Sequence, residues 1–245
     1  MARPDEGDEL WLGVPPGWIE LVAHTDDAEA SAWFERLLDQ TPALFDDDGR
    51  AILRQAYDEV RRQMPHGLID AAGALITALE DDSATLWQFS VAVLTMPPSG
   101  DVNLMAVVER FLESPQGRRP LTDEDDLVES FRTEDGRDGV AIHTTARIDD
   151  GGQLAANVPG TDPARLGVVY AAVRLNRPRA ATADRIAVVT GVAPNVEQRL
   201  AMSLVAAQLT LSAQLRDHDD APLPGRVHLD ATGRGRELSD RSTAP

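Results

Sequence analysis

The sequence predicts an α+β fold, an α/β/α sandwich in which a mainly antiparallel sheet carries helices on both faces. Three observations predict it. Strand-like and helix-like segments alternate in an order in which hairpins outnumber crossovers, as in antiparallel sheets. Residues 165–175 and 185–192 are nearly continuously apolar, which indicates strands buried on both faces. No Pro-, Gly- or Ser-rich linker interrupts the chain before residue 217, which favours a single domain.

The first part of the chain predicts one strand and two helices. Residues 18–22 alternate in the manner of a half-buried strand. Asp26 and Glu29 form a capping-box pattern that begins a helix. The apolar stripe of that helix comprises Ala30, Trp33, Phe34, Leu37 and Leu38. Asp46 begins a second helix that extends to about Met64, because its apolar residues recur with a period near 3.6.

The middle of the chain predicts two pairs of strands separated by a short helix. The expected strands are residues 68–79, 84–96, 127–133 and 140–148. Asp101 is the expected cap of a helix over residues 102–113. Residues 114–126 are polar and charged, and predict a loop. Glycines at positions 136 and 139 supply the backbone freedom that the turn of the second pair needs.

The last hairpin, formed by residues 165–175 and 185–192, leads into a long helix expected over residues 195–215. The positions of this helix expected to be buried are Val196, Leu200, Leu204, Val205, Leu209, Leu211 and Leu215. Residues 217–245 show little periodicity and predict a disordered tail, and residues 1–10 predict a flexible amino terminus. The single domain is therefore expected to span residues 11–216.

Lysine and cysteine are both absent from the chain. All 23 basic residues are arginine, and the cysteine count is 0. The sequence therefore excludes Schiff-base and phosphate-loop lysines, thiol nucleophiles and thiolate metal ligands. It also excludes a disulfide scaffold and fits a reducing compartment. The abundance of Ala, Val, Asp and Arg is typical of a high-GC, actinobacterial gene.

The chain is strongly acidic, with a formal net charge of −18. The charge is uneven, since residues 1–50 carry 13 acids and 3 arginines, whereas residues 151–245 carry 9 acids and 11 arginines. Such a charge disfavours nucleic acids and anionic lipids as partners. The acidic amino terminus lacks the apolar run of a signal peptide, and no segment resembles a membrane span. We expect a cytoplasmic protein without membrane insertion.

The polar residues form no recognisable reactive motif. The five histidines are His24, His66, His143, His218 and His228, and none is paired with another at helical spacing. Asp46-Asp47-Asp48-Gly49 lacks the alternate spacing of a calcium loop and reads as a helix cap. The serine-hydrolase elbow, the dinucleotide fingerprint and the phosphate loop are absent. We therefore expect no catalytic residue, no metal and no cofactor.

Arginines and one tryptophan are the candidate partner-binding residues. Arg174, Arg177, Arg179 and Arg185 flank the turn of the last hairpin, and arginine suits carboxylates and phosphates. Two alternatives are open. The arginines either pair locally with acids from the amino half, or dock an acidic partner or small anion. Trp11 either covers a sheet edge or is an exposed anchor.

Two segments carry a family resemblance. Residues 11–20, Trp-Leu-Gly-Val-Pro-Pro-Gly-Trp-Ile-Glu, resemble the opening of a group of uncharacterised actinobacterial proteins of similar size. Residues 188–194, Val-Val-Thr-Gly-Val-Ala-Pro, resemble their closing segment, which a long helix follows. Members of this group are often encoded near type VII secretion systems, and the resemblance implies the PsbP-like fold of LpqN-type lipoproteins. This chain lacks the acylated cysteine of those lipoproteins, so their envelope location is not carried over.

These observations favour a non-enzymatic, cytoplasmic accessory protein that binds another protein, and the resemblance implies a link to type VII secretion. The first alternative is a small-molecule binder that holds an anionic ligand with the arginine-rich hairpin. The second alternative is a hydrolase whose Asp and His residues converge only in space. The sequence does not determine the oligomeric state.

Overall fold

The computed structural model describes most of the chain, with gaps between the described segments. The described residues are 8–22, 26–40, 47–63, 69–78, 84–96, 102–112, 120–121, 126–147, 165–175, 184–194, 196–217, 227–229 and 235–237. No described helix is long and apolar enough to cross a membrane.

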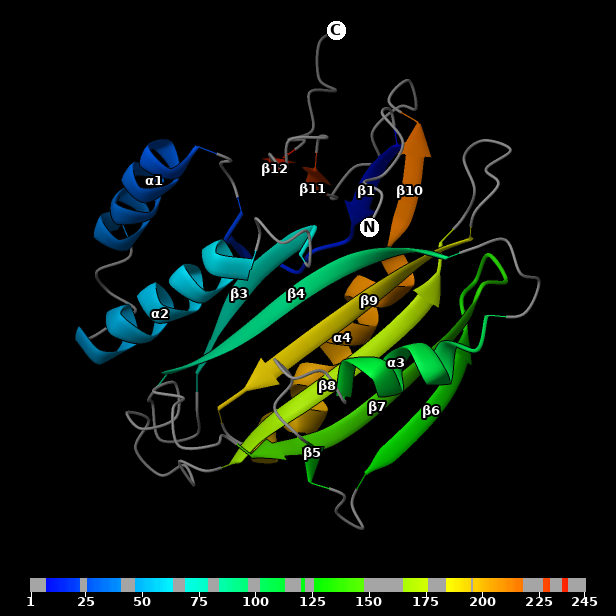
Figure 1. The fold of residues 1–245 in the computed structure, drawn as a ribbon. Helices are drawn as coiled ribbons and strands as arrows, with labels where there is room; N and C mark the ends of the chain where they lie inside the picture. The colour runs from blue at the N-terminus through cyan, green and yellow to red at the C-terminus, as the bar shows by residue number, and fades with distance from the viewer. Residues whose placement is uncertain are drawn as a thin grey trace, which may run out of the picture.

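An eight-stranded antiparallel sheet forms the centre of the molecule (Figure 1). Its strands are β2 (Ile19–Glu20), β3 (Ala71–Ala78), β4 (Ala84–Met96), β5 (Pro120–Leu121), β6 (Leu127–Arg132), β7 (Asp138–Arg147), β8 (Arg165–Arg174) and β9 (Asp184–Ala193). They are ordered β2-β3-β4-β9-β8-β7-β5, and β6 also pairs with β7. Every pairing in this sheet is antiparallel, which confirms the predicted fold class.

Helices cover both faces of this sheet, as the sequence predicts. They are α1 (Asp27–Gln40), α2 (Asp47–Gln63), α3 (Leu104–Leu112) and α4 (Arg199–Ser212), the last preceded by the 3-10 turn η3 (Val196–Gln198). In Figure 1, α3 lies in front of β7 and β8, whereas α4 lies behind the sheet. Alternate residues of β8 and β9 therefore face different helices, and both strands are buried almost throughout.

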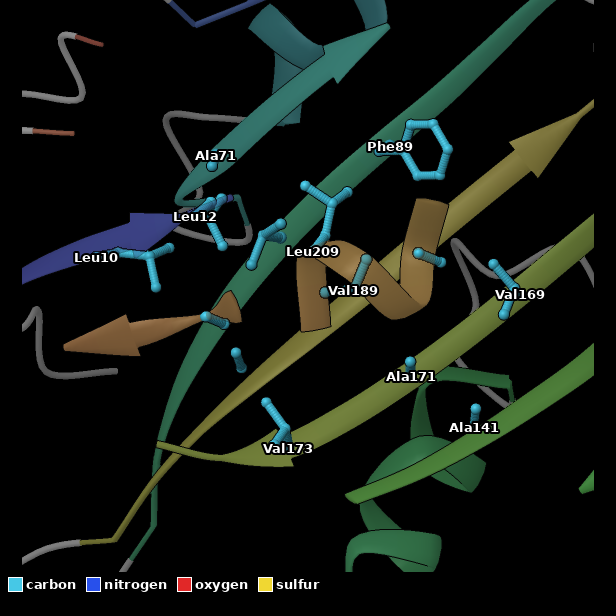
Figure 2. Packing of buried hydrophobic residues seen from close by; sticks show 14 of the residues in the cluster. Leu10, Leu12, Ala71, Phe89, Ala141, Val169, Ala171, Val173, Val189 and Leu209 are labelled. Carbon is cyan, nitrogen blue, oxygen red and sulfur yellow. The ribbon is translucent and has the colours of Figure 1, made fainter. Parts of the chain in front are cut away.

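Three apolar clusters form the core. Val91 of β4 and Val189 of β9 pack with Leu209 of α4 on one face, as Figure 2 shows for Val189 and Leu209. The other face carries two clusters. One joins α3 to β7, β8 and β9, and the second joins α1 and α2 to β3 and β4. In the second, the rings of Phe34 and Tyr57 stack with centroids 4.0 Å apart.

A second, four-stranded sheet joins the two ends of the chain. It is ordered β10-β1-β11-β12, where the strands are β1 (Asp8–Leu12), β10 (Gln214–Asp217), β11 (Val227–Leu229) and β12 (Gly235–Glu237). Leu10, Leu12 and Leu215 from this sheet share a core cluster with α4. In Figure 2, Leu10 and Leu12 lie near Leu209 of that helix.

This sheet corrects the expectations for both ends of the chain. The segment 1–10, predicted to be flexible, contains the start of β1, and the segment 217–245, predicted to be a disordered tail, contains β11 and β12. The strands there are only three to five residues long. So short a strand shows no apolar periodicity of its own, and its order comes from pairing with distant segments.

The sequence predicted some helix caps and strand bounds correctly and others wrongly. Asp26 caps α1 as predicted, since its Oδ1 accepts hydrogen bonds from the backbone N–H groups of Ala28 (3.0 Å) and Glu29 (2.9 Å). The cap of α3 is Asn103 rather than Asp101, because the Asn103 Oδ1 lies 3.0 Å from Met105 N. The expected strand over residues 18–22 is only the two-residue β2, and the predicted loop over residues 114–126 contains β5.

Removal of the α1 cap is the first testable consequence. Asp26→Ala leaves two backbone N–H groups without their acceptor, so we expect the free energy of unfolding to fall by about 1 kcal/mol. Asp26→Asn keeps an acceptor oxygen and should stay close to the wild type. Urea unfolding of the three chains measures the difference, and equal losses in both variants would show that Asp26 does not act as a cap.

Candidate functional site

Helix α4 packs against the main sheet with a stripe of mainly small residues. Its buried residues are Met202, Ser203, Ala206, Leu209 and Thr210. The two hydroxyl groups in this stripe are satisfied within the helix. Ser203 donates to the Leu200 carbonyl (2.6 Å), and Thr210 donates to the Ala206 carbonyl (2.6 Å). Because these hydroxyls need no water, they can be buried at little cost in free energy.

The opposite side of α4 exposes leucine to solvent. Leu204 is 73% exposed, Leu200 60% and Leu211 44%, and Ala207 between them is also exposed. We call these four residues the leucine face. The three leucines are among the large apolar side chains that the described part of the molecule leaves exposed. Large apolar side chains gathered on one surface mark interaction sites more often than chance placement does.

The apolar period of this segment predicted that these leucines lie in the core, and that prediction is wrong. Leu209 is buried as expected, and Leu215 is buried too, but it lies in β10 because the helix ends at Ser212. Helix α4 is apolar around most of its circumference, so the period of its apolar residues does not select a side. Residue size does not select a side either, because Met202 and Leu209 are buried whereas Ala207 is exposed.

The leucine face lies in a stretch of the chain without charge. From Leu200 to Leu215 the sequence contains no Asp, Glu, Arg or Lys, although the whole chain carries 41 acidic and 23 basic residues. The nearest charged residue before this stretch is Arg199, whose Nη1 donates to the Thr145 hydroxyl (3.2 Å). The nearest after it is Arg216, whose guanidinium lies 5.4 Å from the centre of the Trp11 ring.

Arg137 holds the carboxyl end of α4. This residue lies in the turn between β6 and β7, and its side chain is only 9% exposed. Its guanidinium donates to the carbonyls of Leu211 (3.2 Å) and Ala213 (2.6 Å), and to that of Arg174 at the end of β8 (3.3 Å). A cation at this position satisfies carbonyls that have no partner within the helix and interacts favourably with the helix dipole.

Asp135 orients the Arg137 guanidinium. Both carboxylate oxygens of Asp135 lie 2.8 Å from Arg137 Nε, and the Thr133 hydroxyl also donates to this carboxylate. Partial burial acts to raise the pKa of Asp135, but the hydrogen bonds from Thr133 and Arg137 and the charge of Arg137 outweigh it. The net result is a pKa below the usual value for aspartate.

Three further hydrogen bonds hold the rest of α4. The Gln198 side chain, at the amino end, accepts a hydrogen bond from Trp87 Nε1 (2.9 Å). Near the carboxyl end, the Ser212 hydroxyl accepts one from Gly13 N (2.7 Å), and Gln208 donates to the Gly13 carbonyl (3.2 Å). The helix is therefore tied to both sheets, and its leucine face has a fixed orientation.

The predicted arginine cluster is divided by the sheet. Arg174 donates to the Val102 carbonyl (2.9 Å) on the side of α3, and it lies 3.7 Å from Asp184. Arg185 faces the other side and is only 5% exposed. Its charge opposes the effect of burial, which raises the pKa of Asp70. Arg174 therefore pairs with an acid of the same hairpin and not of the amino half, whereas Arg185 lies near Asp70 of the amino half. Arg177 and Arg179 lie outside the described residues.

Trp11 is not an exposed anchor, because it is only 2% exposed. It lies in β1, where its backbone pairs with Gln214 of β10 and with His228 of β11. The indole ring is covered on one side by the guanidinium of Arg216. Trp11 therefore belongs to a strand that is paired on both edges, which neither of the two alternatives describes. Pro15 and Pro16, which follow Trp11 in the sequence, do not indicate that β1 is paired on both edges.

The structure describes the side chain of one histidine, His143, and it lies beside an acid. His143 of β7 is 5% exposed, and its Nε2 is 3.4 Å from Oε2 of Glu129 in β6. The hydroxyl of Thr145 lies two residues further along the same face of β7. It accepts a hydrogen bond from Arg199 rather than contacting His143 or Glu129. The described residues contain no group of three or more acids and histidines that could hold a metal ion. His24, His66 and His218 lie outside the described residues.

Comparison with known proteins gives little beyond a distant likeness in shape. No family model matches the chain, and no curated protein matches it. One solved structure that is similar is LpqN, from Mycobacterium tuberculosis, described as involved in cell envelope biogenesis. It shares 9% sequence identity with this chain at a TM-score of 0.41, and the alignment covers 87% of this chain and 86% of LpqN.

This likeness bears on the expected family only in part. LpqN is the kind of protein that the sequence resemblance named, but a TM-score of 0.41 carries no argument about function. An association with type VII secretion has no support in the comparisons, and a PsbP-like fold is not shown. The candidate site therefore has to be interpreted from its own residues.

Loss of the Arg137 side chain should destabilise the fold substantially. Arg137→Ala leaves the carbonyls of Leu211 and Ala213 without their donor, so we expect the free energy of unfolding to fall by about 2–3 kcal/mol. The matched control is Arg132→Ala in the same hairpin. Arg132 pairs with Asp138 while 70% exposed, so its loss should cost less than about 1 kcal/mol. Similar losses in urea unfolding would contradict the role given to Arg137.

The lowered pKa of Asp135 predicts a pH dependence. The pKa of Asp135 in the folded protein lies below its pKa in the unfolded chain, which is about 3.9. Asp135 therefore stabilises the fold fully at pH values above the unfolded pKa. The contribution is lost as the pH falls through the folded pKa. We expect the stability difference between the wild type and Asp135→Asn to be constant near neutral pH and to shrink below about pH 4. Unfolding measured from pH 7 to pH 3 tests this, and a constant difference throughout would contradict it.

Proposed function

We propose that this chain is a non-enzymatic accessory protein that binds a protein chain through the leucine face of α4. The observation that carries the proposal is the exposure of Leu200, Leu204 and Leu211 on one side of a helix. Complete burial of a leucine is worth about 1.5–3 kcal/mol relative to full exposure. A partner that covers the three side chains therefore gains a substantial part of the free energy of binding from them.

The fixed orientation of α4 supports the same proposal. Arg137 holds one end of the helix and Gln198 the other, through hydrogen bonds to separate parts of the sheets. A surface that does not have to be ordered on binding loses less conformational entropy. Leucines on a mobile segment could instead fold back onto the molecule, but these contacts keep them facing solvent.

The two alternative functions have less support from the described residues. An anionic-ligand site at the last hairpin requires its arginines to converge, yet Arg174 and Arg185 face opposite sides of the sheet. A hydrolase of the expected kind requires Asp and His side chains that reach water and substrate, whereas His143 is only 5% exposed and the acid beside it is Glu129. The proposal also includes a cytoplasmic location and a link to type VII secretion, for which the support comes from the sequence alone.

A charged substitution in the leucine face tests the proposal. Leu204→Glu places a carboxylate where the partner must bury an apolar side chain, so bound proteins should be lost. Because Leu204 is 73% exposed, the substitution should leave the free energy of unfolding almost unchanged. The matched control is Val128→Glu, which alters an apolar side chain that is 51% exposed on β6.

The measurement is affinity capture with quantitative mass spectrometry, using the wild type and both variants as immobilised chains. The source should contain untagged copies of this chain as well as other cellular proteins. We expect a set of proteins retained by the wild type and by Val128→Glu but lost with Leu204→Glu. Retention of the same proteins by all three chains would show that the leucine face is not the docking surface.

A further inference from the structure

We propose that the partner of the leucine face is a second copy of this chain, bound by antiparallel packing of α4 against α4. This inference rests on the proposed function and deepens it by naming the partner. Its starting point is the spacing of the four residues of the leucine face, which are separated by four, three and four positions. This alternation is the seam of a helix that packs lengthwise against another helix.

The residues that flank the seam of α4 indicate what kind of helix packs against it. In helix pairs, charges that flank the seam select a partner with complementary charges and reject others. The flanking positions of α4 that are exposed carry Ala201 and Gln208, and neither is charged. Such a surface offers nothing to select a charged partner helix, and it offers nothing that would repel an identical one.

The overall charge of the molecule points to the same contact. Two copies that each carry a formal charge of −18 repel one another wherever acidic surfaces meet. The stretch from Leu200 to Leu215 contains no ionisable side chain. Two copies that approach through α4 therefore bring their least charged helical surfaces together and keep most of their carboxylates apart.

An antiparallel arrangement fits the sizes of the side chains. The middle of the seam lies between Leu204 and Ala207, so a two-fold axis there places Leu204 of each copy beside Ala207 of the other. Leu200 then lies opposite Leu211. A large side chain beside a small one allows the helices to approach to the usual 8–10 Å. A parallel arrangement would instead set Leu204 against Leu204 and leave a gap between the two alanines.

Sedimentation equilibrium of the purified chain tests the inference. Across a concentration series that reaches about 0.3 mM, where a contact of micromolar Kd is largely formed, we expect the mass to rise from 26.5 kDa towards twice that value. Leu204→Glu should remain at the mass of the monomer, and Val128→Glu should behave as the wild type. Added salt should strengthen the association, because it screens the repulsion between the copies.

A second measurement defines the orientation. The chain contains no cysteine, so single cysteines can be introduced without background. An equimolar mixture of Leu200→Cys and Leu211→Cys chains with different tags should form a mixed disulfide dimer on mild oxidation. Each variant alone should form little. Cross-linking of Leu200→Cys with itself would overturn the antiparallel arrangement.

The outcomes separate this inference from the function on which it rests. A wild-type chain that stays monomeric up to the highest concentration overturns the dimer. If Leu204→Glu nevertheless loses other captured proteins, the leucine face still docks a protein, and only the identity of its partner is wrong. A dimer that persists unchanged in Leu204→Glu also overturns the inference, because the copies then meet elsewhere.

Discussion

The hydrogen bonds of the Arg137 guanidinium are the interaction on which the arrangement of the site depends. One side chain joins the turn between β6 and β7, the end of β8 and the carboxyl end of α4. These segments are far apart in the sequence, at residues 135, 174 and 211–213. Because the group is charged and mostly buried, its contacts are stronger than those of a neutral donor, and they fix the rotation of α4 about its own axis.

The central sheet explains why α4 presents a candidate docking surface. Strands β8 and β9 are buried on both faces, so they need a helical layer on each side. On one side α3 covers β8 and β9, while α1 and α2 cover β3 and β4. On the other side α4 covers β8 and β9 while the small sheet, through Leu10, Leu12 and Leu215, packs beside it. A single helix therefore has one side in the core and its other side free to contact a partner.

The sequence was sufficient for most of the fold and insufficient for the site, for identifiable physical reasons. The strands over residues 165–175 and 185–192 were predictable because continuous apolarity directly reflects burial on both faces. The Asp26 cap was predictable because it acts within three residues. The exposed side of α4 was not predictable, because leucines and small residues occur on both sides of that helix. The opposite orientations of Arg174 and Arg185 depend on strand register, which emerges only from pairing.

The small residues on the inner side of α4 also set how thick the molecule is at this point. A longer side chain at Ala206, which is 0% exposed, would push the helix outward from β8 and β9. The carbonyls of Leu211 and Ala213 would then move out of reach of the Arg137 guanidinium. A misfit in the middle of the helix would therefore break hydrogen bonds at its carboxyl end. The buried methyl group of Ala206 thus couples the distance between α4 and the main sheet to the hydrogen bonds that Arg137 makes at the end of the helix.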